Sequence, residues 1–232
     1  MRNPVSTLLA FLLAGLAPLS AQDGFKSIFD GKTLAGWDGN PDLWSVEDGA
    51  LTGKTKGPDH LAYNQFLIWR GGAPKNFEFH AKARCSASNS GIQYRSKVVD
   101  AAGFVVGGYQ ADFEAGKTYS GILYEERGRG ILAERGQRTR ITEVNGQTRI
   151  VKVGDLAPSA ELQANIRAND WNDYVVIADG NHLMHFINGR MTIEVIDEQA
   201  AKAAKSGVLA LQIHAGPPMQ VQFKDILLKR LP

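Results

Sequence analysis

The sequence predicts an all-β protein built as an antiparallel β-sandwich, and three observations lead to this prediction. Glycine is abundant, 25 of 232 residues, and is spread along the chain rather than clustered. Short runs of β-branched and aromatic residues lie between Gly, Asn and Asp turn signals, a pattern typical of sandwiches and barrels. Apolar and polar side chains alternate with a period of two from Phe77, which predicts a strand at 76–84 with one buried and one polar face.

The chain begins with the features of a signal peptide. Arg2 supplies a positive charge, residues 8–19 form an apolar run, and small residues precede Gln22. The apolar run is shorter than the roughly 20 residues that a membrane-spanning helix needs. We therefore expect cleavage of residues 1–21, a secreted or periplasmic protein without stable membrane insertion, and a single domain over residues 22–232.

The charge balance and the single cysteine exclude several classes of function. The net charge is +2, and loss of Arg2 with the signal peptide lowers it to +1. A nearly neutral protein has no general field that attracts a phosphate backbone, so we expect no nucleic-acid partner. The basic stretch at 127–140 is interrupted by Glu134 and glycines, which favours a solvated hairpin. Cys85 is the single cysteine, so the chain cannot form an internal disulfide. It ends the apolar side of the alternating run that starts at Phe77, so we predict a buried thiol rather than a nucleophile.

The remaining elements follow from turn signals and short apolar runs. The dipeptides Asp-Gly at 48–49, Asp-Gly at 179–180 and Asn-Gly at 188–189 favour tight hairpin turns. Residues 197–206 carry acids at the start and lysines near the end, and Gly207 follows as a stop signal, so we predict one short helix there. Further strands are predicted at 45–47, 51–53, 66–69, 91–95, 109–113, 122–125, 140–143, 173–179, 183–187, 191–196, 208–214 and 220–229.

Three of the predicted strands carry pairs of polar side chains two residues apart. Side chains at i and i+2 of a strand emerge on one face, about 7 Å apart. Ordinary solvated faces favour Lys, Glu and Thr, whereas these pairs combine amide, guanidinium, carboxylate and imidazole groups that suit a polyhydroxyl ligand. We therefore favour a sugar-binding surface over a plain solvated one, formed by Gln93 and Arg95, Gln110 and Asp112, and Gln212 and His214.

Residues in the connecting segments extend this predicted surface. Tyr124, Glu126 and Arg127 follow or end a strand, and they form either a wall of the cleft or a salt-bridged hairpin. Trp171 precedes a strand, where its ring either stacks on a sugar or is buried. The sequence contains no Ser-His-Asp constellation, phosphate-binding loop or dinucleotide fingerprint, so we expect no organic cofactor.

Eight short motifs follow one another along the chain. The first, FKSIFDGKTLAGW, occupies residues 25–37, and the last ends at residue 214, within a resemblance to a known family that covers residues 25–231. In content and order the motifs resemble the 3-keto-disaccharide hydrolase family. The resemblance implies a concanavalin- or laminarinase-like jelly roll with its ligand on a concave face. It also implies activity on glycosides oxidised to a ketone at sugar carbon 3, together with a divalent metal. The other seven motifs lie at 44–51, 89–95, 108–112, 121–125, 171–174, 188–189 and 211–214.

The chemistry implied by this resemblance needs a base and an electrophile. A ketone at carbon 3 acidifies the hydrogen on carbon 2, so a base can remove it and expel the aglycone from carbon 1. Water then adds to the glycal, and the net result is hydrolysis. Our hypothesis gives His214 or Asp112 the role of base or metal ligand, with Glu126 as a further catalytic candidate. Arg95 is expected to bind the ketone or ring oxygens. The remaining substrate-binding candidates are Gln93, Gln110, Tyr124, Arg127, Trp171 and Gln212.

Two alternatives compete with this hypothesis. A two-carboxylate glycosidase of the same fold carries closely spaced acids along one strand, in a Glu-x-Asp-x-x-Glu pattern. This chain has Asp112 and Glu114 but no such trio, which disfavours direct hydrolysis of an unoxidised glycan. The second alternative is a secreted, non-catalytic carbohydrate-binding module, because sandwiches bind sugars with or without chemistry.

Overall fold

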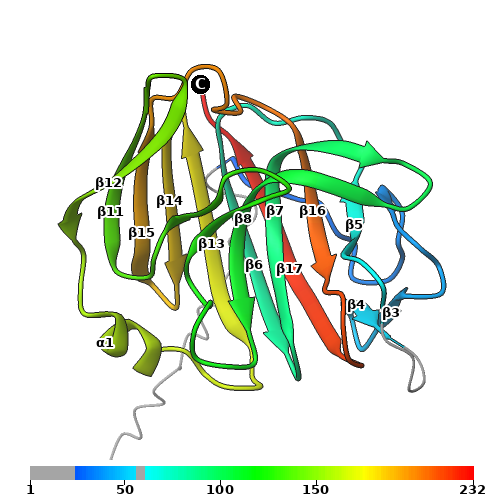
Figure 1. Cartoon of the computed structure of the whole chain (residues 1–232). Helices are drawn as coiled ribbons and strands as arrows, with labels where there is room; N and C mark the ends of the chain where they lie inside the picture. The colour runs from blue at the N-terminus through cyan, green and yellow to red at the C-terminus, as the bar shows by residue number, and fades with distance from the viewer. Residues whose placement is uncertain (1–23, 56–60) are drawn as a thin grey trace, which may run out of the picture.

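The structure is a computed structural model that describes residues 24–55 and 61–232. The predicted signal peptide, residues 1–21, lies outside the described residues. Two sheets, one of ten strands and one of seven, pack face to face, and a short helix, α1 (Ser159–Ala164), lies beside them (Figure 1). The predicted β-sandwich is therefore confirmed. Within residues 24–55 and 61–232, no helix is long and apolar enough to cross a membrane.

The larger sheet has the strand order β12, β11, β15, β14, β13, β6, β17, β4, β3, with β1 beside β17. Its neighbouring strands are antiparallel except β11 and β15, which are parallel. The strands are β1 (Lys26–Ser27), β3 (Trp44–Glu47), β4 (Ala50–Lys54), β6 (Phe77–Cys85), β11 (Gln137–Val144), β12 (Gln147–Asp155), β13 (Asn172–Asp179), β14 (His182–Ile187), β15 (Arg190–Asp197) and β17 (Gln220–Arg230).

The smaller sheet is antiparallel throughout, in the order β10, β9, β8, β7, β16, β5, β2. It lies in front of the larger sheet in Figure 1, with β7, β8 and β16 at its centre. The strands are β2 (Trp37–Asp38), β5 (Gln65–Trp69), β7 (Asn89–Asp100), β8 (Val105–Glu114), β9 (Leu123–Glu126), β10 (Gly130–Ala133) and β16 (Val208–Ile213).

Strand β6 shows why the two sheets pack together. Every second residue from Phe77 to Cys85 is buried, as its alternation predicts. Tyr94 of β7 and Tyr109 of β8 point into the same core, where the ring centroids of Phe77 and Tyr94 are 6.1 Å apart. The Cys85 thiol donates to the carbonyl oxygen of Ala87 at 2.8 Å, and burial raises its pKa to about 11. The prediction of a buried thiol is confirmed.

The predicted hairpin turns are confirmed. Residues 48–49 join β3 to β4, and residues 188–189 join β14 to β15. The hairpin between β13 and β14 is also present, but its loop is Gly180–Asn181, because Asp179 still pairs with His182. At the last turn Asn188 and Gly189 both have positive φ, 49° and 76°, the backbone geometry that an Asn-Gly pair favours.

The predicted helix at 197–206 is wrong. β15 continues to Asp197, whose buried carboxylate lies 2.6 Å from the guanidinium of Arg129. Gln199 is also buried, and its side-chain oxygen accepts a hydrogen bond from Arg129 at 3.2 Å. These long-range contacts override the local helix propensity. A single turn remains, in which the N–H of Lys202 donates to the carbonyl oxygen of Gln199. The short helix of the fold is α1 instead.

A histidine on β14 faces the core between the sheets. His185 is buried, and its Nε2 shares a hydrogen bond of 2.9 Å with the hydroxyl of Tyr94. Burial lowers the pKa of His185 to about 3, so the imidazole is neutral in the folded state at neutral pH. In the unfolded chain the imidazole takes up a proton below about pH 6.5.

We expect this histidine to make the fold sensitive to acid. Its contribution to stability is fully present above about pH 6.5 and is lost as the pH falls toward about 3, because only the unfolded state binds the proton. His185→Phe removes this term, so its free energy of unfolding should fall less than that of the wild type between about pH 7.5 and pH 4. Urea titrations at both pH values measure this, with His80→Phe as the partly exposed control. Parallel losses in the wild type and His185→Phe would contradict the assignment.

Candidate functional site

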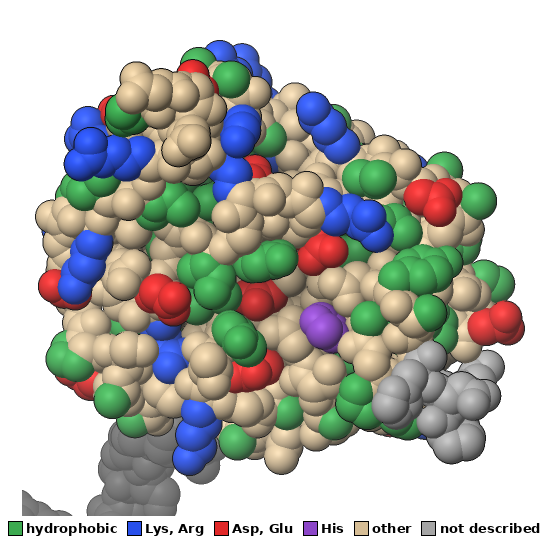
Figure 2. Space-filling model, viewed as in Figure 1, with side chains coloured by type: hydrophobic (Ala, Val, Ile, Leu, Met, Phe, Trp, Pro, Cys, Tyr) green, Lys and Arg blue, Asp and Glu red, His purple; other side chains and the backbone are tan. Residues whose placement is uncertain are grey.

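A polar cavity of about 640 Å³ opens on the face of the smaller sheet that points away from the larger sheet. Figure 2 views this side of the molecule, where acidic, apolar and histidine side chains gather near the middle of the face and basic side chains lie above them. Six of the predicted site residues line the cavity: Gln110, Asp112, Tyr124, Glu126, Gln212 and His214.

Strand register explains this convergence. On β8, Gln110 pairs with Gln93 of β7 on one side and with Tyr124 of β9 on the other. Asp112 lies two residues further along and pairs with Gly91. A Cβ at Gly91 would come 2.3 Å from Cγ of Gln110, so only glycine leaves room for that side chain to lie across β7.

A row of hydrogen bonds runs along the floor of the cavity. The hydroxyl of Ser96 donates to Oε1 of Gln93 at 2.6 Å, and Nε2 of Gln93 donates to Oε1 of Gln110 at 2.7 Å. Nε2 of Gln110 in turn donates to Oδ1 of Asp112, and Nδ2 of Asn89 donates to the other carboxylate oxygen at 3.3 Å. Each amide in this row therefore has a fixed orientation.

The Asp112 carboxyl at the end of this row is a group that titrates near neutral pH. It is only 6% exposed, and burial raises its pKa to about 7. The hydrogen bonds from Gln110 and Asn89 act in the opposite direction, and the nearby carboxyls of Glu114 and Glu126 add to the rise. Such a group is able both to accept and to release a proton at neutral pH.

Two further titratable groups, His214 and Glu126, line the cavity. His214 Nδ1 donates to the carbonyl oxygen of Ala215 at 2.6 Å, which leaves Nε2 as the proton-accepting nitrogen of the neutral ring. Burial raises the pKa of Glu126, whereas a hydrogen bond from Asn64 and the charges of nearby Arg127 and His214 lower it. Nδ2 of Asn64 donates to both Glu126 oxygens at 3.3 Å, and Ala215 N–H donates to Asn64 Oδ1 at 2.8 Å.

Gln212 supplies a free hydrogen-bond donor. Its side chain is buried, and its Nε2 has no partner among the described residues. Its Oε1 lies 3.5 Å from Nε2 of Gln110, which orients the amide. A buried N–H group without a partner is costly unless a ligand completes it.

Two predicted substrate-binding residues have other roles in the structure. Gln93 is completely buried beneath Gln110 and orients it instead of reaching a ligand. Arg95 does not share the face of Gln93, so that prediction is wrong. A register shift between Tyr94 and Lys97 and a φ of 46° at Arg95 turn its side chain away. Its guanidinium donates to backbone carbonyls of Lys75 at 2.8 Å, Gly180 at 2.7 Å and Ala204 at 3.3 Å.

Trp171 and Arg127 also lie outside this cavity. Trp171 is placed between two cations, with Arg84 at 4.6 Å and Lys224 at 4.3 Å from its ring centroid, so the expected sugar stacking is not supported. Arg127 is exposed in the turn between β9 and β10, next to Glu126. Sequence reasoning missed Asn64, which lies outside the strands. It also missed Asn89 at the start of β7, although its motif was recognised.

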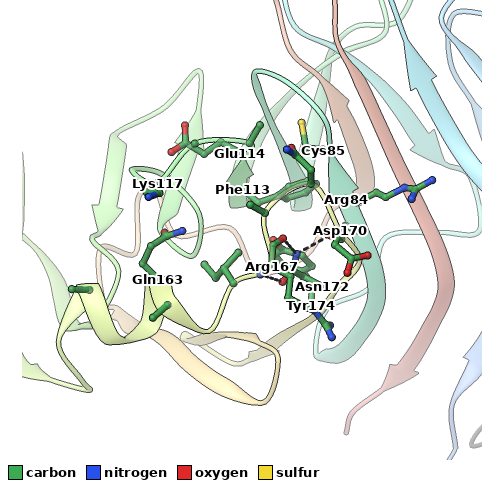
Figure 3. Close-up of a pocket in the computed structure, with 18 residues that line it drawn as sticks. Arg84, Cys85, Phe113, Glu114, Lys117, Gln163, Arg167, Asp170, Asn172 and Tyr174 are labelled. Carbon is green, nitrogen blue, oxygen red and sulfur yellow. Dashed lines mark hydrogen bonds between the residues drawn. The ribbon is translucent and has the colours of Figure 1, made fainter.

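A second cavity, of about 400 Å³, lies beside α1 (Figure 3). Several of its charged and polar side chains are engaged by their own neighbours, although the buried Oε1 of Gln163 has no partner among the described residues. Arg84 Nε donates to Gln222 at 2.8 Å, Asn172 bonds the backbone of Arg167, and Glu114 accepts the backbone N–H of Tyr119 at 2.8 Å. The cavity at Asp112 combines three acid–base groups with a free donor, and it is therefore the candidate active site.

The site does not fit the divalent metal that the resemblance implies. Among residues 24–55 and 61–232, no three His, Cys, Asp or Glu side chains are close enough together to hold an ion. The two oxygens of Asp112 instead face the N–H groups of Gln110 and Asn89. The Asp112 carboxylate is therefore arranged as an acceptor of amide N–H groups and not as a metal ligand.

Comparisons with known proteins agree with the fold. The family model described as "3-keto-alpha-glucoside-1,2-lyase-like domain" matches residues 24–229. A crystal structure of a "putative glycosyl hydrolase" from Parabacteroides distasonis is similar, with 16% identity, a TM-score of 0.58, and coverage of 90% of this chain and 94% of that one. The carbohydrate-binding module CBM66 from Bacillus subtilis has 14% identity and a TM-score of 0.52, over 84% of this chain and 95% of that one. No curated protein matches the chain.

Proposed function

This chain belongs to the 3-keto-alpha-glucoside-1,2-lyase-like domain family, and we propose that it cleaves 3-keto-glycosides by proton abstraction at carbon 2, elimination of the aglycone and hydration. The observation that carries the proposal is the buried Asp112 carboxyl, which has a pKa of about 7 at the floor of a polar cavity. Abstraction of a proton next to a ketone needs a base that titrates near the working pH.

In the proposed first step, Asp112 takes the proton from carbon 2. The electron pair moves into an enolate and then expels the aglycone oxygen from carbon 1. Glu126, or His214 when its Nε2 carries a proton, supplies the proton that the leaving oxygen needs, because both line the same cavity as Asp112. Water then adds hydroxyl to carbon 1 and a proton to carbon 2, and the products are a 3-keto sugar and the free aglycone.

The enolate oxygen requires a hydrogen-bond donor. We assign this role to Nε2 of Gln212, the buried donor without a partner. Gln110 and Tyr124 lie side by side on β8 and β9, and we assign them contacts with the sugar hydroxyls. We also propose that the protein acts outside the cytoplasm after removal of residues 1–21.

The proposal is tested with a chromogenic 3-keto-glucoside and its unoxidised parent glucoside. We expect release of the aglycone from the ketone alone, because only the ketone acidifies carbon 2. In D₂O the released sugar should carry one deuteron at carbon 2, measured by NMR against an enzyme-free exchange control. Cleavage of the parent glucoside, or release without deuterium, would contradict elimination. Binding without release would indicate a carbohydrate-binding module.

Removal of metal ions tests whether Gln212 or a divalent cation stabilises the enolate. Under our assignment, turnover persists in EDTA because Gln212 stabilises the enolate. Loss of turnover in EDTA, with recovery on addition of a divalent cation, would assign that role to a metal instead.

A further inference from the structure

A larger groove, of about 790 Å³, adjoins the active-site cavity. Glu126 lines both, so the groove begins where we place the leaving-group oxygen. Its walls are the turn between β9 and β10, the segment 201–206 and part of the β7–β8 hairpin. The basic side chains above the central acidic cluster in Figure 2 occupy the same side of the molecule.

The groove carries more positive than negative charge, although the carboxylate of Glu126 lies near Arg127. Besides the buried Arg95, four of its lining residues are basic and form no ion pair with any carboxylate of the described residues: Lys97, Arg127, Lys202 and Lys205. Its two acids are already engaged. Glu125 accepts from Arg129 at 2.6 Å, and Glu126 accepts from Asn64.

A buried arginine contacts the backbone of the segment 201–206, which carries two of these cations. Arg95 donates to the carbonyl oxygen of Ala204, between Lys202 and Lys205. Arg127 has a φ of 54° in the turn between β9 and β10, where the N–H of Gly128 donates to the carbonyl oxygen of Glu125.

We propose that this groove binds an anionic group, a carboxylate or a sulfate, on the leaving-group side of the substrate. The inference rests on the proposed function, because Glu126 faces the departing oxygen only if the glycoside lies in the neighbouring cavity. Arginine and lysine side chains recognise such oxyanions through charge-assisted hydrogen bonds.

The test compares aryl 3-keto-glucosides that differ only in their para substituent. A carboxylate, a sulfonate and the neutral, isosteric carboxamide are used. We expect the wild type to prefer the carboxylate over the carboxamide by about tenfold in kcat/KM, mainly through KM, and to lose this preference as ionic strength rises. An equal preference for the sulfonate identifies charge as the recognised feature, and a preference for the carboxylate alone identifies its planar geometry.

Charge-removing variants locate the effect. Arg127→Gln and Lys202→Gln should each reduce the ratio of kcat/KM for the carboxylate to that for the carboxamide, whereas the exposed Lys54→Gln on β4 should not. A ratio near one in the wild type, or a ratio that the groove variants do not change, would overturn the inference.

Equilibrium binding distinguishes failure of this inference from failure of the proposed function. If none of the three aryl 3-keto-glucosides is turned over, the proposed function fails. Calorimetry with the unoxidised carboxylate and carboxamide glucosides then tests the groove alone. Tighter, salt-sensitive binding of the carboxylate that Arg127→Gln weakens would still support an anion site. Equal binding of the two would overturn it.

Discussion

Replacing Asp112 by asparagine should lower kcat/KM for a 3-keto-glucoside by a factor of about 10²–10⁴, the range expected for loss of a general base. Asparagine has nearly the same shape, so the row of amides beneath it should keep its hydrogen bonds on the Oδ1 side. The asparagine amide cannot take a proton from carbon 2. Steady-state kinetics measure the loss, and Asp173→Asn on the exposed surface of β13 serves as the matched control.

The pH profile gives this prediction a second readout. Asp112 works as a base only when ionised, and burial raises its pKa to about 7. We therefore expect kcat/KM of the wild type to fall as the pH drops below about 7. The residual activity of Asp112→Asn should lack this limb. A variant that retains the limb would show that another group, such as His214, is the base.

Asp112→Asn should not destabilise the fold at neutral or higher pH. A carboxyl whose pKa is raised in the folded state binds its proton more tightly there than in the unfolded chain. Its contribution to stability is therefore present at low pH and is lost as the pH rises from about 4 through 7. Removal of the carboxyl should give an equal or higher midpoint of thermal unfolding above pH 7. A large decrease would mean that lost activity reports unfolding.

The largest effect on stability is expected from Arg129→Ala, a loss of about 3–5 kcal/mol in the free energy of unfolding. The guanidinium is 4% exposed and lies 2.6 Å from both the Glu125 and the Asp197 carboxylates. Its Nη2 also lies 3.4 Å from the hydroxyl of Tyr109. Removal of the arginine would leave two buried carboxylates without a partner.

Urea unfolding measures this loss, and Arg140→Ala is the matched control. Arg140 forms an ion pair with Glu198 at 3.0 Å, but its side chain is 53% exposed, so we expect a change below about 1 kcal/mol. Combining Arg129→Met with Glu125→Gln and Asp197→Asn should recover part of the loss, because the unpaired charges disappear. Similar losses for Arg129→Ala and Arg140→Ala would contradict a special role for the buried network.

Local periodicity was enough to predict the fold and the convergence of residues at the centre of the candidate site. The alternation in β6, the Asp-Gly turn at 48–49 and the Asn-Gly turn at 188–189 are encoded by neighbouring residues, and the structure has them as predicted. The pairs Gln110 and Asp112, and Gln212 and His214, converge because strands with period two place them on one face. These features need no knowledge of distant contacts.

The failures arise where distant contacts decide the backbone. Arg95 leaves the predicted face because a bulge interrupts β7, and carbonyls from three separate segments bind its guanidinium. The segment 197–206 is not helical because Asp197 and Gln199 are drawn to Arg129, about 70 residues away in sequence. Asn64 reaches the site from outside the strands, where no periodic pattern marks it.

The hydrogen bonds in the row beneath the candidate active site all run in one direction. Each glutamine amide accepts through its oxygen and donates through its nitrogen, so turning one amide over would bring two oxygens or two NH₂ groups face to face. The ionised carboxylate of Asp112 can only accept, so it sets the direction by requiring the nitrogen of Gln110 to face it. The hydroxyl of Ser96 at the far end, which does not line the cavity, can donate or accept and therefore adapts to the oxygen that Gln93 presents. Amides do not exchange protons readily, so the row conveys orientation and not charge, and the proton on Asp112 has to arrive and leave through the cavity itself.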